Sequence, residues 1–211
     1  ILQIVPLTAL GIAIIILGTT IAITSPQPLP KETIQLLINS AIQNIEALLE
    51  EFTTIEKAIY IPKKERTYAY IPLNPTQIDP NQIKRTPNRL LVKVGEHYGL
   101  QLIPPATELI KTLNLETTEE TNIEDILRTL LVDLTDLAEG VKTISKENTI
   151  IVEINGIKLE IEAPNYIETL GSLQASITAT TIATILKKPV KIIEEKLEKN
   201  KTTIKIQILG E

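Results

Sequence analysis

The chain has 211 residues, a formal net charge of −5, one histidine, and no cysteine, methionine or tryptophan. The missing cysteines exclude disulfides, thiol chemistry and iron–sulfur ligation, and a single histidine does not make a zinc cluster. Acidic and basic residues are interspersed, so we find no basic patch of the kind that binds nucleic acid. We therefore expect no metal, no cofactor, no catalytic residues and no nucleic-acid partner. The bias toward Ile, Lys, Glu and Thr suits a hyperthermophilic protein.

Residues 1–24 carry no charged side chain and are mostly apolar. A membrane-spanning helix needs about 20 apolar residues, so this segment is long enough to cross a bilayer. It lacks the basic start and the small-residue cleavage site of a secretory signal peptide. We predict one hydrophobic helix, which lies either in the lipid of a membrane or in the core of a filament.

The chain starts directly in this helix without a methionine. In this respect residues 1–24 resemble a processed archaeal type IV pilin, and the resemblance implies a homo-oligomeric filament at the cell surface. We identify Pro6, Gly11 and Gly18 as candidate self-association residues. The two glycines share a helix face, and a proline is better tolerated where neighbouring helices cover the carbonyl that it frees. A plain transmembrane anchor is the alternative.

Three prolines within residues 25–31 predict that the helix ends and a stiff spacer follows. Apolar residues from Ile34 to Leu49 then recur at intervals of three and four, which predicts an amphipathic helix. The expected organisation is a hydrophobic helix over 1–24, a spacer over 25–31 and a globular domain over 32–211.

The first half of this domain is predicted to contain a hairpin over 55–73, a long loop over 72–87, and strands over 89–94 and 100–104. A helix follows over 104–115. In the second half, Thr121 and Glu124 form a capping box for a helix that ends at Gly140.

Asn155-Gly156 predicts a hairpin over 149–162, because this dipeptide is the strongest short hairpin signal. A helix over 170–188 and a closing strand over 202–209 complete the chain. We therefore expect an α+β domain with a mostly antiparallel sheet and helices packed on one face of it.

Few side chains are candidates for chemistry. His97 lies in a turn flanked by glycines, and we interpret it as a solvated turn residue. We place Asp133, Asp136 and Glu139 on one helix face and interpret them as solvated, because a calcium loop needs a glycine turn that this helix lacks. Asn200 begins a glycosylation sequon, which matters only if the domain faces outward.

Ala175, Ala179 and Ala183 form a small-residue stripe on the helix over 170–188. We interpret the stripe as close packing of this helix onto the sheet, with a subunit contact as the alternative. 

From the hydrophobic start through "TSPQPLP", "KAIYIP", "YGLQLIPPATELI" and "SLQASITATTIATILKKPV", the chain also resembles a family of uncharacterised archaeal membrane proteins. That resemblance implies a hydrophobic N-terminal region joined to one α/β domain, and no catalytic residue. The expected function is a non-enzymatic structural surface protein, membrane-inserted or pilin-like. The alternative is a membrane-tethered ligand-binding or sensory module.

Overall fold

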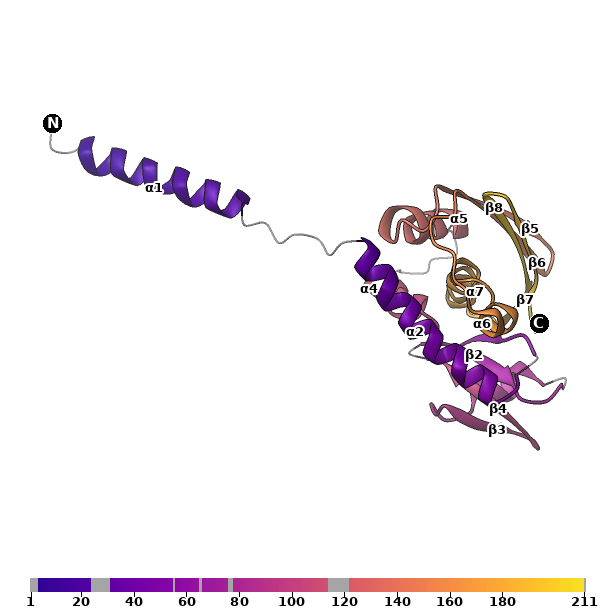
Figure 1. The fold of residues 1–211 in the computed structure, drawn as a ribbon. Helices are drawn as coiled ribbons and strands as arrows, with labels where there is room; N and C mark the ends of the chain where they lie inside the picture. The colour runs from indigo at the N-terminus through magenta and orange to yellow at the C-terminus, as the bar shows by residue number, and fades with distance from the viewer. Residues whose placement is uncertain are drawn as a thin grey trace. The chain divides into compact units, whose positions relative to one another are not determined.

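The computed structural model describes residues 4–23, 31–54, 56–64, 66–75, 78–113 and 122–210 (Figure 1). It divides into two units, Ile1–Ile38 and Asn39–Glu211. Most of the predicted spacer lies outside the described residues, and so does Thr121 of the predicted capping box.

Helix α1 (Ile4–Ile23) lies in the first unit and confirms the predicted helix. Its described large apolar side chains are 57–66% exposed: Leu10, Ile12, Ile14, Ile15, Ile16 and Leu17. Successive helical residues are about 100° apart, so positions 14–17 alone present apolar groups around most of the helix. In the part of the chain that the structure describes, no helix has both the length and the apolar character of a membrane span. The membrane or filament placement of α1 stays a prediction.

Helix α2 (Lys31–Glu51) confirms the helix predicted from the apolar spacing. The two ends of its predicted apolar stripe differ in burial. Ile42 and Leu49 are 3% and 1% exposed, whereas Ile34 and Leu37 are 43% and 63% exposed. Only the part of α2 from Asn39 onward belongs to the second unit.

An eight-stranded sheet forms the centre of the second unit, with the order β3-β4-β2-β1-β7-β8-β6-β5. Every strand pairing in it is antiparallel. The halves β3-β4-β2-β1 and β7-β8-β6-β5 are joined through β1 and β7 by the pairs Ile59–Lys191 and Tyr60–Val190. The α+β class with an antiparallel sheet is therefore confirmed. The strands are β1 (Ile59–Pro62), β2 (Thr67–Pro72), β3 (Leu91–Val94), β4 (His97–Leu102), β5 (Gly140–Lys146), β6 (Thr149–Asn155), β7 (Val190–Glu198) and β8 (Lys201–Ile208).

The helices of this unit are mostly short. They are α3 (Pro80–Lys84), α4 (Ala106–Thr112), α5 (Ile123–Arg128), the π-helical turn η1 (Thr129–Leu134), α6 (Pro164–Leu170) and α7 (Leu173–Leu186).

Helix α7 packs against β1, β2 and β7, and also contacts α4 and α5. Ala175, Ala179 and Ala183 are all 0% exposed, which confirms that the stripe serves packing within the domain. The alternative, a subunit contact, is wrong for this stripe because the three side chains are already covered.

Four threonines of α7 donate their hydroxyls to the carbonyl four residues earlier, at 2.7–2.8 Å: Thr178, Thr180, Thr181 and Thr184. A buried hydroxyl without a partner is costly, and these bonds satisfy it within the helix itself. A threonine-rich helix can therefore occupy the centre of the domain.

Helical segments cover both faces of the sheet at β1, which corrects the expectation of one covered face. Ile59 and Ile61 join Ile83 of α3 in one buried cluster. Tyr60 points to the opposite face, because side chains alternate along a strand, and its hydroxyl donates to Leu170 O of α6 at 2.6 Å. Strand β2 is accordingly buried along its whole length. The predicted loop over 72–87 contains α3, whose N-cap Asp79 accepts from Asn81 N at 2.9 Å.

Two predicted elements in the second half are wrong. The helix predicted up to Gly140 ends at Leu134, and Gly140 instead begins β5. The predicted hairpin at Asn155-Gly156 is absent, because β6 ends there and its partners are β5 and β8. Gly156 has φ +68 and donates its N–H to Asn200 O at 2.8 Å, so the glycine redirects the chain out of the sheet.

Candidate ligand-binding cavity

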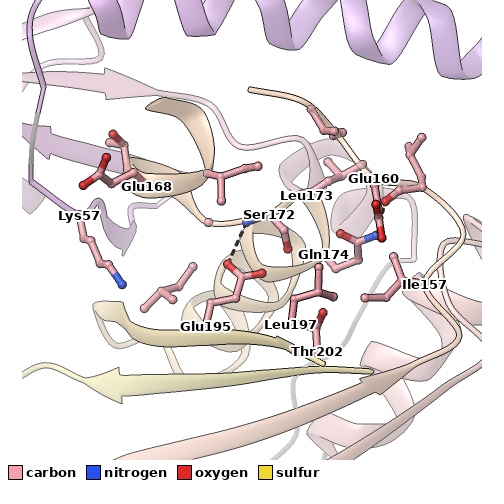
Figure 2. A pocket seen from close by; sticks show the side chains of 16 residues that line it. Lys57, Ile157, Glu160, Glu168, Ser172, Leu173, Gln174, Glu195, Leu197 and Thr202 are labelled. Atoms are coloured by element: carbon pink, nitrogen blue, oxygen red, sulfur yellow. Dashed lines mark hydrogen bonds between the residues drawn. The ribbon is translucent and has the colours of Figure 1, made fainter. Parts of the chain in front are cut away.

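A cavity of about 410 Å³ lies between the α6–α7 junction, the extended segment 157–161 and strands β7 and β8 (Figure 2). Its volume lies within the range of small-molecule sites, which are mostly apolar with a few placed polar groups. The apolar lining residues are Ile157, Leu159, Ile161, Ile167, Leu173, Ile192 and Leu197.

A β-bulge in β7 turns Glu195 toward this cavity. Ile192 pairs with Ile206, but after the bulge Glu195 pairs with Ile204. Directly paired residues share a sheet face, so Ile192 and Glu195 lie on the same face although they are three positions apart. Without the bulge, Glu194 would take that place.

The junction between α6 and α7 receives the Glu195 carboxylate. Its Oε2 accepts from Ser172 N at 3.0 Å, at the N-terminal end of α7, where a negative charge is favourable (Figure 2). The Ser172 hydroxyl caps the same helix by accepting from Ala175 N at 3.2 Å. Gly171 has φ +79, and a Cβ there would lie 2.9 Å from Ile192 Cδ1. A glycine is therefore required for the junction to approach β7 this closely.

Most other polar lining groups already form hydrogen bonds with backbone atoms. Lys57 Nζ donates to Ile193 O at 3.2 Å, and Gln174 Nε2 donates to Leu159 O at 2.8 Å. Thr169 differs, because it is 3% exposed and its hydroxyl has no hydrogen-bond partner within the described structure. The lining thus offers apolar contact, one unsatisfied hydroxyl, and polar groups among which Lys57, Gln174 and Glu195 already bond backbone atoms.

Two tyrosines from β1 and α6 are buried near this site, Tyr60 and Tyr166. Burial raises the pKa of Tyr166 to about 12. Burial also raises the pKa of Tyr60 well above its ordinary value, and the neighbouring Tyr166 and Glu195 add to that rise. Ser176 Oγ and Tyr166 OH are buried without a hydrogen-bond partner within the described structure.

Helix α2 holds the start of α6 through one carboxylate. Glu46 accepts from Asn165 N at 3.0 Å and from Tyr166 N at 2.7 Å, and the Asn165 side-chain amide donates to it as well. These bonds satisfy N–H groups that the first turn of a helix leaves open. The long-range contact therefore fixes α6, which supplies one wall of the cavity.

The candidate residues from the sequence lie elsewhere. His97 is the first residue of β4, paired with Val94, so its placement in a turn was wrong. Asp133 lies in η1, whereas Asp136 and Glu139 follow it, so these three residues do not share a helix. No group of His, Cys, Asp or Glu in the described ranges is arranged to hold a metal ion.

Asn200 is exposed in the turn between β7 and β8, but Thr202 of its sequon is 3% exposed and lines the cavity. Glycosylation of Asn200 stays a prediction.

Gly11 and Gly18 of α1 have no atom within 4 Å of an added Cβ, and Pro6 lies in the same helix. Self-association through them likewise stays a prediction.

Residues 4–208 match the family model of a domain of unknown function, DUF7982. The chain belongs to this family. No curated protein and no solved structure was found to match it. Membership thus covers the helix α1 and the sheet domain together, and it assigns no activity to the cavity.

Sequence reasoning missed Lys57, Thr169 and Glu195 as lining residues. They come from the segment before β1, from α6 and from a bulged strand, and no motif links them. The bulge in particular inverts the faces expected from strict alternation along β7. No signal in the sequence indicated it.

Proposed function

We propose that this protein is a non-enzymatic binding module, tethered to a membrane at the cell surface by α1, which takes a small and mainly apolar molecule in the cavity. The observation that carries the proposal is the cavity itself, with its apolar lining. Lys57, Gln174 and Glu195 each bond a backbone group, which supports a role for them in shaping the walls over a role in a reaction.

The proposed membrane attachment is supported by the exposed surface of α1. Its apolar side chains are exposed around the helix, and the described polar hydroxyls are satisfied inside it. Thr19 Oγ1 donates to Ile15 O at 2.9 Å, and Thr20 Oγ1 donates to Ile16 O at 2.7 Å. Such bonds lower the cost of placing a hydroxyl in an apolar environment, whether lipid or protein.

Leu197→Asp is expected to weaken binding of the neutral dye N-phenyl-1-naphthylamine by about tenfold or more, because it places a charge on an apolar wall. Leu197 is 59% exposed, so the domain tolerates the change. The matched control is Ile193→Asp, on the same strand and 42% exposed but outside the lining. Fluorescence titration of both variants of the 211-residue chain measures the difference, and equal dye affinities would contradict the proposal.

A filament or helical-assembly subunit is the second candidate, favoured by the open glycine positions of α1. Gly11→Leu and Gly18→Leu are expected to lower the crosslinked oligomer yield severalfold, because a bulky side chain blocks close helix approach. In a simple anchor the same leucines add apolar surface and are neutral or slightly favourable for insertion. Crosslinking in membranes, followed by gel analysis, separates the two roles. Unchanged oligomer yield in both variants would leave α1 as an anchor.

A further inference from the structure

A second cavity lies in the other half of the sheet, beside β2 and β4. Its volume is about 550 Å³, and it is lined by Arg66, Tyr68, Asn88, Arg89, Leu90, Gln101, Leu102 and Ile103. Two of these residues are arginines, and no carboxylate is among the described lining residues. The chain as a whole has a net charge of −5, but the described lining of this cavity carries positively charged hydrogen-bond donors.

Gln101 provides a buried donor without an acceptor. The residue is 5% exposed, and its Oε1 accepts from Lys63 Nζ at 2.6 Å. Because a lysine ammonium group can only donate, this bond fixes which end of the amide is oxygen. The position of the Oε1 atom also fixes the position of Nε2, which is buried without a hydrogen-bond partner. Leaving a buried donor unsatisfied costs about 1–3 kcal/mol, which an acceptor from a ligand would offset.

The groups around Gln101 are cationic. Lys63 Nζ also donates to Thr86 O at 3.0 Å and lies 5.1 Å from the centroid of the Tyr68 ring. Arg66 is 39% exposed and has an ion pair with Glu108 at 3.5 Å, which leaves further guanidinium N–H groups able to donate. Arg89 is exposed. A negatively charged acceptor suits this set better than a neutral one.

The other side of the cavity is apolar. Leu90 and Ile103 are 49% and 47% exposed, and both line the cavity. A bare inorganic ion would leave these side chains in water. An anion that carries a short hydrocarbon part would cover them and gain about 25 cal/mol per Å² of apolar surface buried.

We propose that this cavity binds the phosphate or carboxylate group of a small organic anion, with Gln101 Nε2, Arg66 and Arg89 as donors to the anionic group and with Leu90 and Ile103 against its apolar part. This site is separate from the cavity at α6 and α7 and does not depend on the function proposed for it.

The test is isothermal titration calorimetry on the full chain in a neutral detergent, with inorganic phosphate, butyl phosphate and butyrate as probes. Butyl phosphate is expected to bind more tightly than inorganic phosphate because of the apolar contact. Comparison of butyl phosphate with butyrate distinguishes the two anionic groups. Either organic anion binding at this site supports the proposal, and the absence of saturable binding of both overturns it.

Gln101→Glu is the sharpest variant. It keeps an oxygen that can accept from Lys63, but it replaces the donor with a carboxylate oxygen that repels the anion. We expect the affinity for the organic anion to fall by about a hundredfold or more. The variant loses a hydrogen bond to the anion and also adds a charge repulsion. Unchanged thermal unfolding of the variant shows that the domain still folds. A folded variant with the parent's affinity would overturn the proposal.

Arg89→Gln provides a second variant at an exposed position, with Lys142→Gln on β5 as the matched control. Both changes lower the positive charge by one, but β5 lies at the opposite edge of the sheet from β3 and β4. We expect Arg89→Gln to weaken binding of the organic anion about tenfold and Lys142→Gln to leave it nearly unchanged. An equal loss in both variants would indicate only a general charge effect and would contradict a site at Arg89.

Discussion

Ile14→Asp is expected to reduce partition of the full chain into neutral phosphatidylcholine vesicles by about a hundredfold, because an acidic side chain at the centre of an inserted helix costs about 2.5–3.5 kcal/mol. Ile14 is 62% exposed and lies near the middle of α1. The change therefore removes little packing within the protein, and its effect reports on the surroundings of the helix. Vesicle flotation measures the bound fraction.

Leu36→Asp is the matched control for this experiment. Leu36 is 66% exposed on α2, so the substitution introduces the same charge at an equally exposed leucine of another helix. Flotation of this variant is expected to stay close to that of the parent. If both variants float as well as the parent, α1 does not carry the attachment, and the tether that we propose is wrong.

Above pH 10 the second unit is expected to lose stability, and Tyr166→Phe is expected to reduce that loss by about 1.4 kcal/mol at pH 11. Burial raises the pKa of Tyr166 from its ordinary value of 10.0 to about 12, so the folded state keeps the phenol protonated where the unfolded chain releases the proton. The contribution is therefore fully present below pH 10 and is lost as the pH rises through 12. Tyr60 has a raised pKa for the same main reason and adds to the loss.

Urea unfolding at pH 8, 10 and 11 in the parent and in Tyr166→Phe measures this effect. At pH 8 the variant is expected to be as stable as the parent or slightly more stable, because the buried Tyr166 hydroxyl has no hydrogen bond to lose within the described structure. Comparing the two proteins at each pH cancels the effect of lysine deprotonation. A parallel decline of both with pH would show that Tyr166 does not contribute.

Local sequence signals predicted those elements whose partners are close in the chain. The hairpin of β1 and β2 was predicted within residues 55–73, and the structure confirms it. Helices α1 and α2 were likewise predicted from hydrophobicity and spacing. In each case the apolar pattern and the backbone preference point to the same structure.

The signal at Asn155-Gly156 failed because a distant strand competed for the same edge. Strand β8, about fifty residues further along the chain, occupies the side of β6 that a local hairpin would have used. The helix predicted to reach Gly140 failed in a similar way, since residues 140–146 pair with β6 along their whole length. Non-local pairing overrode the local preference in both places.

Composition and hydrophobic pattern by themselves determined that this protein, which has no cysteine, joins a mostly apolar helix to an antiparallel α+β domain. Both cavities were decided by the tertiary structure alone. Glu195 reaches the first cavity through a bulge in β7, and Gln101 presents an unsatisfied amide N–H group because Lys63 binds its oxygen. Such placements depend on strand register and on contacts between residues far apart in the chain, which the hydrophobic periodicity of a single sequence does not encode.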